Sequence, residues 1–260
     1  MNCHIFAGIL ALCLLITFPS DALTIYSTGF ENSEGFPVGS LPITGLNGWI
    51  EEVGNGLSAI VTSQKHTGTQ SLRVAANSTV KKDIVSAGSL IYLDGWYNPP
   101  SSSVFPDLDG YPASSAVFMF HTTSGLIGLD GDGAGNGAWQ ESHILASLGF
   151  NRITLLLDYS NKIWSLYLNE QMIFQNMGFK NKSVSQLNGI RIDSAQNQSG
   201  YLDTFQVLDE PPDFLLQDPT PTITETLLPT PTVTQTPVPS PTLTPTGVPA
   251  SEVLEWKLFR

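Results

Sequence analysis

The segment from Arg152 to Phe174 constrains the fold of this chain more than any other. It reads RITLLLDYSNKIWSLYLNEQMIF, with short alternating runs separated by the turn signals YSNK and NEQ. Alternate residues of a β-strand face opposite sides, so the pattern predicts three consecutive antiparallel strands with one apolar face. An apolar sheet face needs a second layer to cover it, which predicts a β-sandwich with Trp164 in its core.

The rest of the region from 23 to 210 has the same character. Short runs are separated by Gly, Asn, Asp and Pro, and no long stretch has a helical period. Further strands are expected at residues 23–30, 71–75, 89–97, 116–121, 189–193 and 201–208. The first and last of these should pair, because compact domains tend to bring their termini together.

The first 22 residues predict an export signal. Ile5 to Phe18 is almost wholly apolar but short for a membrane span, and Ser20-Asp21-Ala22 supplies the small residues that a signal peptidase reads. We expect cleavage after Ala22 and a secreted or cell-surface protein; an uncleaved anchor is the alternative, since no Lys or Arg precedes the apolar run. Both cysteines, Cys3 and Cys13, lie in this segment, so the mature region would have no disulfide and no cysteine-bound zinc.

A change of composition near Glu210 predicts a second boundary. Residues 211–250 are dominated by Thr and Pro and cannot bury a core, so we expect a disordered, extended linker. The final residues, 251–260 (SEVLEWKLFR), are either a short docking segment for other modules or the start of a truncated domain. We expect no transmembrane segment after signal cleavage. The net charge of -12, with scattered basic residues, argues against nucleic acid or an anionic membrane as a partner.

Several blocks of the sequence resemble one family. In chain order they are GFENSEGFPVGSL, NGW, HTGTQSLRV, LDGDGAGNGAW, the meander and GYLDTFQV. They are similar to blocks of bacterial concanavalin A-like lectin/glucanase domains of the laminin-G-like type, over residues 27–208. The resemblance implies an all-β fold, a two-sheet antiparallel β-sandwich or jelly roll, which is often secreted and joined to other modules by linkers.

Known catalytic patterns are missing. Glucanases with this fold carry Glu-x-Asp-x-Glu on one strand, which places both carboxylates on the same face, and no Glu of this chain is followed two residues later by Asp. There is no Gly-x-Ser-x-Gly motif either. We therefore expect a non-catalytic domain. A polysaccharide lyase or hydrolase that uses His121 with Tyr159 or Arg152 is the less favoured alternative.

The stretch LDGDGAGNGAW allows two interpretations. Counted from Asp130, Asp132 falls at position three and Glu141 at position twelve of a calcium loop, but position five is Ala134 and the flanks read as strands. Alternating glycines permit positive φ angles, which a sharp turn between strands requires. We favour a turn; calcium at Asp130 and Asp132 is the alternative.

The resemblance to jelly-roll binding modules implies another candidate calcium site. In such modules an acid after the first strand and an acid on the last strand often hold a structural calcium, and here these positions match Glu31 and Asp203. The alternative is that both are solvated acids at the sheet edge. The sequence leaves the two interpretations open.

Aromatic residues in loop-like segments suggest a glycan as ligand. Sugars bind flat rings through their C–H faces and acids or amides through their hydroxyls. Four residues are candidates for this role: Trp139, Tyr111, Tyr97 and Trp96. Core packing is the alternative for each, and it is the favoured interpretation for Trp96. It is also favoured for Trp49, a further aromatic residue beside a loop-like segment. The first hypothesis is thus a non-catalytic carbohydrate-binding or adhesion module, secreted or tethered at a surface. The alternative is a structural or protein-interaction domain of an extracellular assembly.

Overall fold

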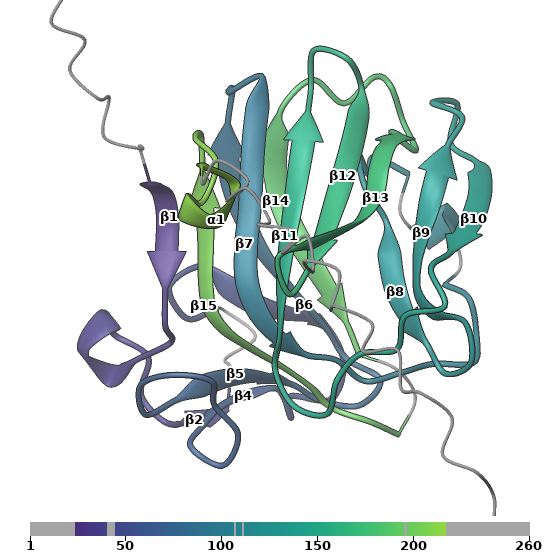
Figure 1. The fold of residues 1–260 in the computed structure, drawn as a ribbon. Coiled ribbons are helices and arrows are strands. Elements are labelled where there is room, and N and C mark those ends of the chain that lie inside the picture. The colour runs from purple at the N-terminus through teal and green to yellow at the C-terminus, as the bar shows by residue number, and fades with distance from the viewer. Residues whose placement is uncertain (1–23, 41–44, 107, 111, 195–196, 217–260) are drawn as a thin grey trace, which may run out of the picture. The chain divides into compact units, whose positions relative to one another are not determined.

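The structure is a computed structural model that describes residues 24–40, 45–106, 108–110, 112–194 and 197–216 (Figure 1). The expected signal, most of the expected linker, the final segment and Tyr111 lie outside these residues. The described part is nearly all β, as predicted. It includes three short helices: η1 (Asn32–Glu34), η2 (Leu108–Gly110) and α1 (Asp213–Leu216). None of the helices in the described ranges is long and apolar enough to cross a membrane.

The first layer of the sandwich is a large antiparallel sheet. Its order is β13 (Gln171–Gly178), β12 (Ile163–Leu168), β11 (Asn151–Asp158), β7 (Leu90–Asn98), β15 (Gly200–Leu208), β5 (Ser71–Val74), β4 (Ala59–Val61) and β2 (Gly39–Ser40). β1 (Thr24–Thr28) pairs with β15, as expected for the first and last strands. The predicted meander is β11-β12-β13, with Leu157 opposite Trp164.

The second layer consists of two separate three-stranded sheets. One has the order β14 (Leu187–Asp193), β6 (Thr79–Ser86) and β3 (Trp49–Val53), and the other β10 (Gly137–Glu141), β9 (Gly125–Gly131) and β8 (Phe118–His121). In Figure 1, β6 and β14 lie behind the large sheet and β8, β9 and β10 lie to one side. The described part is therefore a two-layer antiparallel sandwich whose second layer is divided.

The hydrophobic core lies between the two layers. Trp164 of β12 is buried, as the alternating pattern predicts, and so are Trp49 of β3, Phe30 and Phe179. Phe30 and Trp49 pack edge to face at 5.2 Å between ring centroids. Such aromatic pairs bury large apolar areas and fix how the two layers pack.

The outer face of the large sheet carries a buried ion pair. Asp94 of β7 accepts hydrogen bonds from Nε and Nη2 of Arg152, both at 3.0 Å, and from the hydroxyl of Thr154 at 2.5 Å. The guanidinium lies 4.7 Å from the ring centre of Phe214 in α1. The described chain thus continues to residue 216, into the region expected as linker, and Phe214 packs on this face.

Candidate functional site

The β9–β10 hairpin positions Trp139, and its turn explains the glycine-rich stretch. The Asp132 carboxylate (Oδ1) accepts hydrogen bonds from the backbone N–H groups of Ala134 at 2.7 Å and Asn136 at 3.1 Å. Gly133 and Gly135 have φ angles of 80° and 111°, which favour glycine. The predicted turn between two strands is confirmed.

The two acids of this hairpin bind backbone groups of different segments. Hydrogen bonds from Ala134 and Asn136 lower the pKa of Asp132. Asp130 accepts instead from the backbone N–H of Gly178, at 2.7 Å, and so holds the hairpin against the end of β13. Calcium at Asp130 and Asp132 stays a prediction that this arrangement does not require.

Three aromatic side chains meet on the outside of the β8–β10 sheet, and we call them the aromatic ledge: Phe105, His121 and Trp139. The ring of Phe105 lies 5.3 Å from His121, at an interplanar angle of 30°, and 5.5 Å from Trp139, at 50°. Phe105 is 41% exposed, and the other two rings are half-buried. The ledge is thus a curved, partly exposed aromatic surface.

Polar groups flank the ledge. His121 Nδ1 accepts a hydrogen bond from the backbone N–H of Ser124 at 3.1 Å. This bond assigns the proton of the neutral ring to Nε2, so the Nε2–H group is a donor. Glu141 follows Trp139 by two residues on β10, so both side chains leave the same face of the strand. A ring surface with a nitrogen donor and a carboxylate beside it has the composition of a sugar-binding site.

The four predicted ligand residues do not share one surface. Trp139 lies on the ledge and Tyr111 lies outside the described residues. Trp96 and Tyr97 are neighbours on β7 and therefore face opposite sides of the large sheet. Tyr97 packs against the core, whereas Trp96 lies on the outer face.

Trp96 is covered on one side by a histidine. The rings of His66 and Trp96 stack at 3.6 Å between centroids and at an angle of 12°. Desolvation lowers the pKa of His66, and the Asp203 carboxylate partly opposes this shift. One indole face of Trp96 is therefore occupied, which makes it a poorer sugar platform than Trp139.

Glu31 and Asp203 hold one loop from its two ends. The Asp203 carboxylate accepts the backbone N–H groups of His66 at 2.7 Å and Thr67 at 3.0 Å. Glu31 accepts the backbone N–H of Thr69 at 2.7 Å and its hydroxyl at 2.5 Å, and these bonds lower its pKa, the hydroxyl contributing most. Both predicted metal ligands thus serve the same loop, which we call the clamped loop, residues 66–70.

Both predicted calcium ligands already accept hydrogen bonds from the chain. Calcium needs six to eight oxygen ligands. Oε1 of Glu31 accepts a second N–H, from Gln70, and Oδ1 of Asp203 accepts the N–H of Thr204, so most of their acceptor capacity is used. No group of three or more His, Cys, Asp or Glu side chains within the described ranges is placed to hold a metal. Structural calcium stays a prediction, and the hydrogen bonds explain the loop without it.

The residues considered for catalysis are dispersed. Arg152 is paired with Asp94 on the outer face of the large sheet, whereas Tyr159 is buried in the core. His121 lies on the separate β8–β10 sheet. These three side chains do not form a common site.

Sequence reasoning found Trp139 but missed its partners. Phe105 lies in the long segment between β7 and β8, and only the path of that segment brings it onto Trp139. His121 was considered for catalysis and not for sugar binding. Its place on β8, beside β9 and β10, required the strand order.

No protein-family model matches the chain, and no curated protein matches it. Membership of the concanavalin A-like family therefore stays a prediction from the sequence blocks.

Comparison with solved structures gives distant likenesses. The binding domain of Paraclostridial mosquitocidal protein 1 aligns with 74% of this chain at 15% identity and a TM-score of 0.49, and this chain covers 50% of it. Domain 4 of a GH43 extracellular arabinanase from Geobacillus stearothermophilus, in complex with arabinotriose, aligns with 72% of this chain and 92% of its own at 12% identity, with a TM-score of 0.45. A CBM22-1 xylan-binding domain from Paenibacillus barcinonensis aligns with 74% and 97% at 14% identity, with a TM-score of 0.33. All three scores are below 0.5, so the function has to be argued from the site.

Proposed function

We propose that the domain binds carbohydrate without transforming it, as a secreted or surface-tethered module. The aromatic ledge is the observation that carries this proposal. Sugar rings would lie on Trp139 and Phe105, and the Glu141 carboxylate and the His121 Nε2 proton would bind sugar hydroxyls.

Charge indicates which glycans suit the ledge. The chain carries a net charge of -12, and the ledge has a carboxylate beside it. A polyanionic glycan would be repelled at low ionic strength, so a neutral polysaccharide fits best.

The test is a pull-down of the full chain on a panel of neutral and acidic polysaccharides, followed by affinity measurement on whichever is retained. Trp139→Ala should weaken binding at least about 10-fold, as expected for an aromatic residue that anchors a ligand. Trp96→Ala is the matched control on the other sheet and should bind normally. Equal loss in both variants, or no retention of the folded chain on any polysaccharide, would reject the ledge as a sugar site.

A protein-binding role is the second candidate, favoured by one exposed apolar loop. Ile144, Leu145 and Leu148 follow β10, and Leu148 is fully exposed. Exposed apolar clusters often mark protein interfaces. Binding of a protein partner that is lost in Leu145→Ser with Leu148→Ser, but kept in Trp139→Ala, would favour this role.

A further inference from the structure

The second layer of the sandwich is open along one seam. Among the described residues, β14 and β8 are edge strands of two sheets that do not pair with each other. A cavity of about 700 Å³ is lined by both of these edges and by the inner faces of β7 and β11. This volume is within the range of small-molecule sites, about 300–1,000 Å³.

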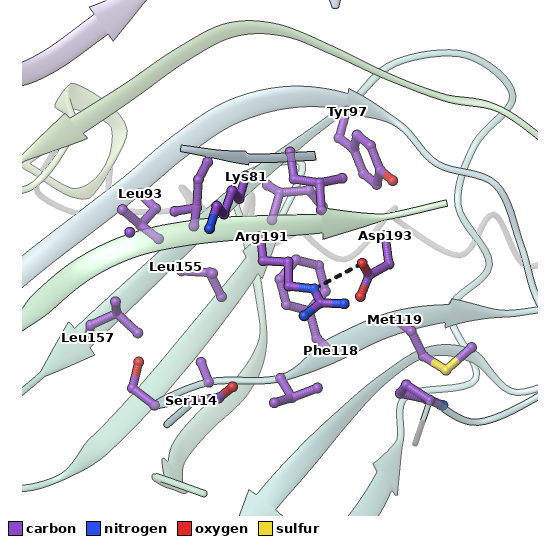
Figure 2. A pocket seen from close by; sticks show the side chains of 18 of the residues that line it. Lys81, Leu93, Tyr97, Ser114, Phe118, Met119, Leu155, Leu157, Arg191 and Asp193 are labelled. Carbon is purple, nitrogen blue, oxygen red and sulfur yellow. Dashed lines mark hydrogen bonds and ion pairs between the residues drawn. The ribbon is translucent and has the colours of Figure 1, made fainter. Parts of the chain in front are cut away.

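The cavity reaches the space between the layers, and the part of its surface that lies there is apolar. Leu93 of β7 and Ile153, Leu155 and Leu157 of β11 form the floor. Ile190 lines one wall of the cavity, and Phe118 lines another (Phe118 is shown in Figure 2). The backbone groups of β7 and β11 are used in pairing with each other and with β15 and β12. A sugar placed against this inner surface would leave its hydroxyls without partners, whereas a hydrocarbon chain has no hydrogen bonds to lose.

Polar side chains also line the cavity, among them Lys81, Arg191 and Asp193. Figure 2 places Tyr97 and Asp193 together at one polar end, away from Leu93 and Leu157. Asp193 accepts hydrogen bonds from Arg191 Nε at 3.1 Å and from the Thr79 hydroxyl at 2.5 Å.

Tyr97 supplies a donor at this polar end. Burial raises the pKa of Tyr97, and the Asp193 charge adds to this, so the phenol stays protonated. Its hydroxyl makes no hydrogen bond to any other residue that the structure describes. A free donor at the end of an apolar cavity suits a ligand that carries an oxygen acceptor at one end.

We propose that the seam cavity binds the straight aliphatic chain of an amphipathic molecule, with a polar oxygen of that molecule at Tyr97. This proposal does not depend on sugar binding by the ledge. The chain can belong to a free fatty alcohol or to a lipid that carries a sugar. Since Phe105 belongs to the ledge and also lines the cavity, a sugar-bearing lipid would contact both.

The test is displacement of the fluorescent apolar probe N-phenyl-1-naphthylamine from the full chain by straight-chain alcohols from hexanol to dodecanol. Affinity should rise about 4-fold for each added methylene until the cavity is filled. Decyl β-glucoside is the second arm. If it binds more tightly than decanol, and Trp139→Ala removes only that difference, the chain comes from a sugar-bearing lipid; equal affinities identify a free amphipathic chain.

Two variants locate the site. Ser114→Trp fills the cavity from its wall and should abolish probe binding while the melting temperature is kept. Tyr97→Phe should weaken alcohol binding about 5-fold, the value of one hydrogen bond, and leave probe affinity unchanged. Tyr201→Phe, on the outer face of β15, is the matched control. Any of three results would overturn the proposal: no binding of the probe, alcohol affinities that do not depend on chain length, or full probe binding by a folded Ser114→Trp variant.

Discussion

Removal of the Asp203 carboxylate tests how the clamped loop is held. Asp203 is completely buried and accepts three backbone N–H groups, from His66 at 2.7 Å, Thr67 at 3.0 Å and Thr204 at 2.7 Å. Bonds to a charged acceptor are worth about 1.5–3 kcal/mol each. His66 and Thr67 are exposed residues, so water can replace part of the hydrogen bonding that their backbone N–H groups lose. We therefore take about 1 kcal/mol for each bond.

Asp203→Ala should therefore reduce the free energy of unfolding by about 3 kcal/mol. For a domain of this size that corresponds to a fall in melting temperature of about 6–12 °C. Urea denaturation and thermal melting measure the change. Asp83→Ala, which removes an exposed acid on β6, is the control and should change stability by less than about 0.5 kcal/mol.

The same experiment distinguishes hydrogen bonds from calcium. If the carboxylates hold the loop through N–H groups, wild-type stability and the effect of Asp203→Ala will be the same in chelator and in calcium. The reasoning would be refuted if the melting temperature of the wild type fell in chelator and no longer differed from that of Asp203→Ala. That result would place a metal at Glu31 and Asp203.

Three further predictions concern stability. Asp94→Ala leaves Arg152 and Thr154 without their buried acceptor and should reduce the free energy of unfolding, measured by urea denaturation, by about 3 kcal/mol. The double variant Asp94→Leu with Arg152→Met should recover most of this loss. A reduction below about 1 kcal/mol in Asp94→Ala would contradict this. A methyl group on Gly131 would lie 2.4 Å from backbone atoms of Phe179, so Gly131→Ala should reduce the free energy of unfolding by about 1–3 kcal/mol. At the control position Gly29 the nearest atom would lie 3.6 Å away, so Gly29→Ala should leave stability nearly unchanged. Equal melting temperatures of the two variants would argue against close packing at Gly131. Hydrogen bonds lower the folded-state pKa of Glu31 below 4.5, so its contribution is complete above the unfolded pKa and is lost as the pH falls through the folded value. The difference in melting temperature between wild type and Glu31→Gln should shrink from about pH 6 to about pH 3, and a constant difference would show that the charge of Glu31 is not involved.

Strand alternation made much of the large sheet predictable. The run from Arg152 to Phe174 alternates clearly enough to fix three strands and the burial of Trp164, and both are observed. The same rule separates Trp96 from Tyr97, because neighbours on a strand face opposite sides. The predicted ligands Trp96 and Tyr97 therefore cannot contact one glycan on the same face of the sheet.

The divided second layer was not predictable from the sequence. β6 reads TVKKDIVS, and its two lysines and its aspartate hide the alternation that a half-buried strand should show. Whether β14 pairs with β8 is decided by tertiary packing, since both strands would satisfy the same local pattern. The cavity at their seam and the contact between Phe105 and Trp139 therefore became visible only in three dimensions.

Sugar binding by the ledge is tested most directly by nuclear magnetic resonance. The chain is titrated with a polysaccharide that it retains, and the indole N–H signals of its tryptophans are followed. The chain has five tryptophans, and buried Trp49 and Trp164 are internal references. The ledge predicts that the Trp139 signal moves in a saturable way, while the signals of Trp49, Trp164 and Trp96 stay in place. Movement of the Trp96 signal with Trp139 unchanged would contradict it.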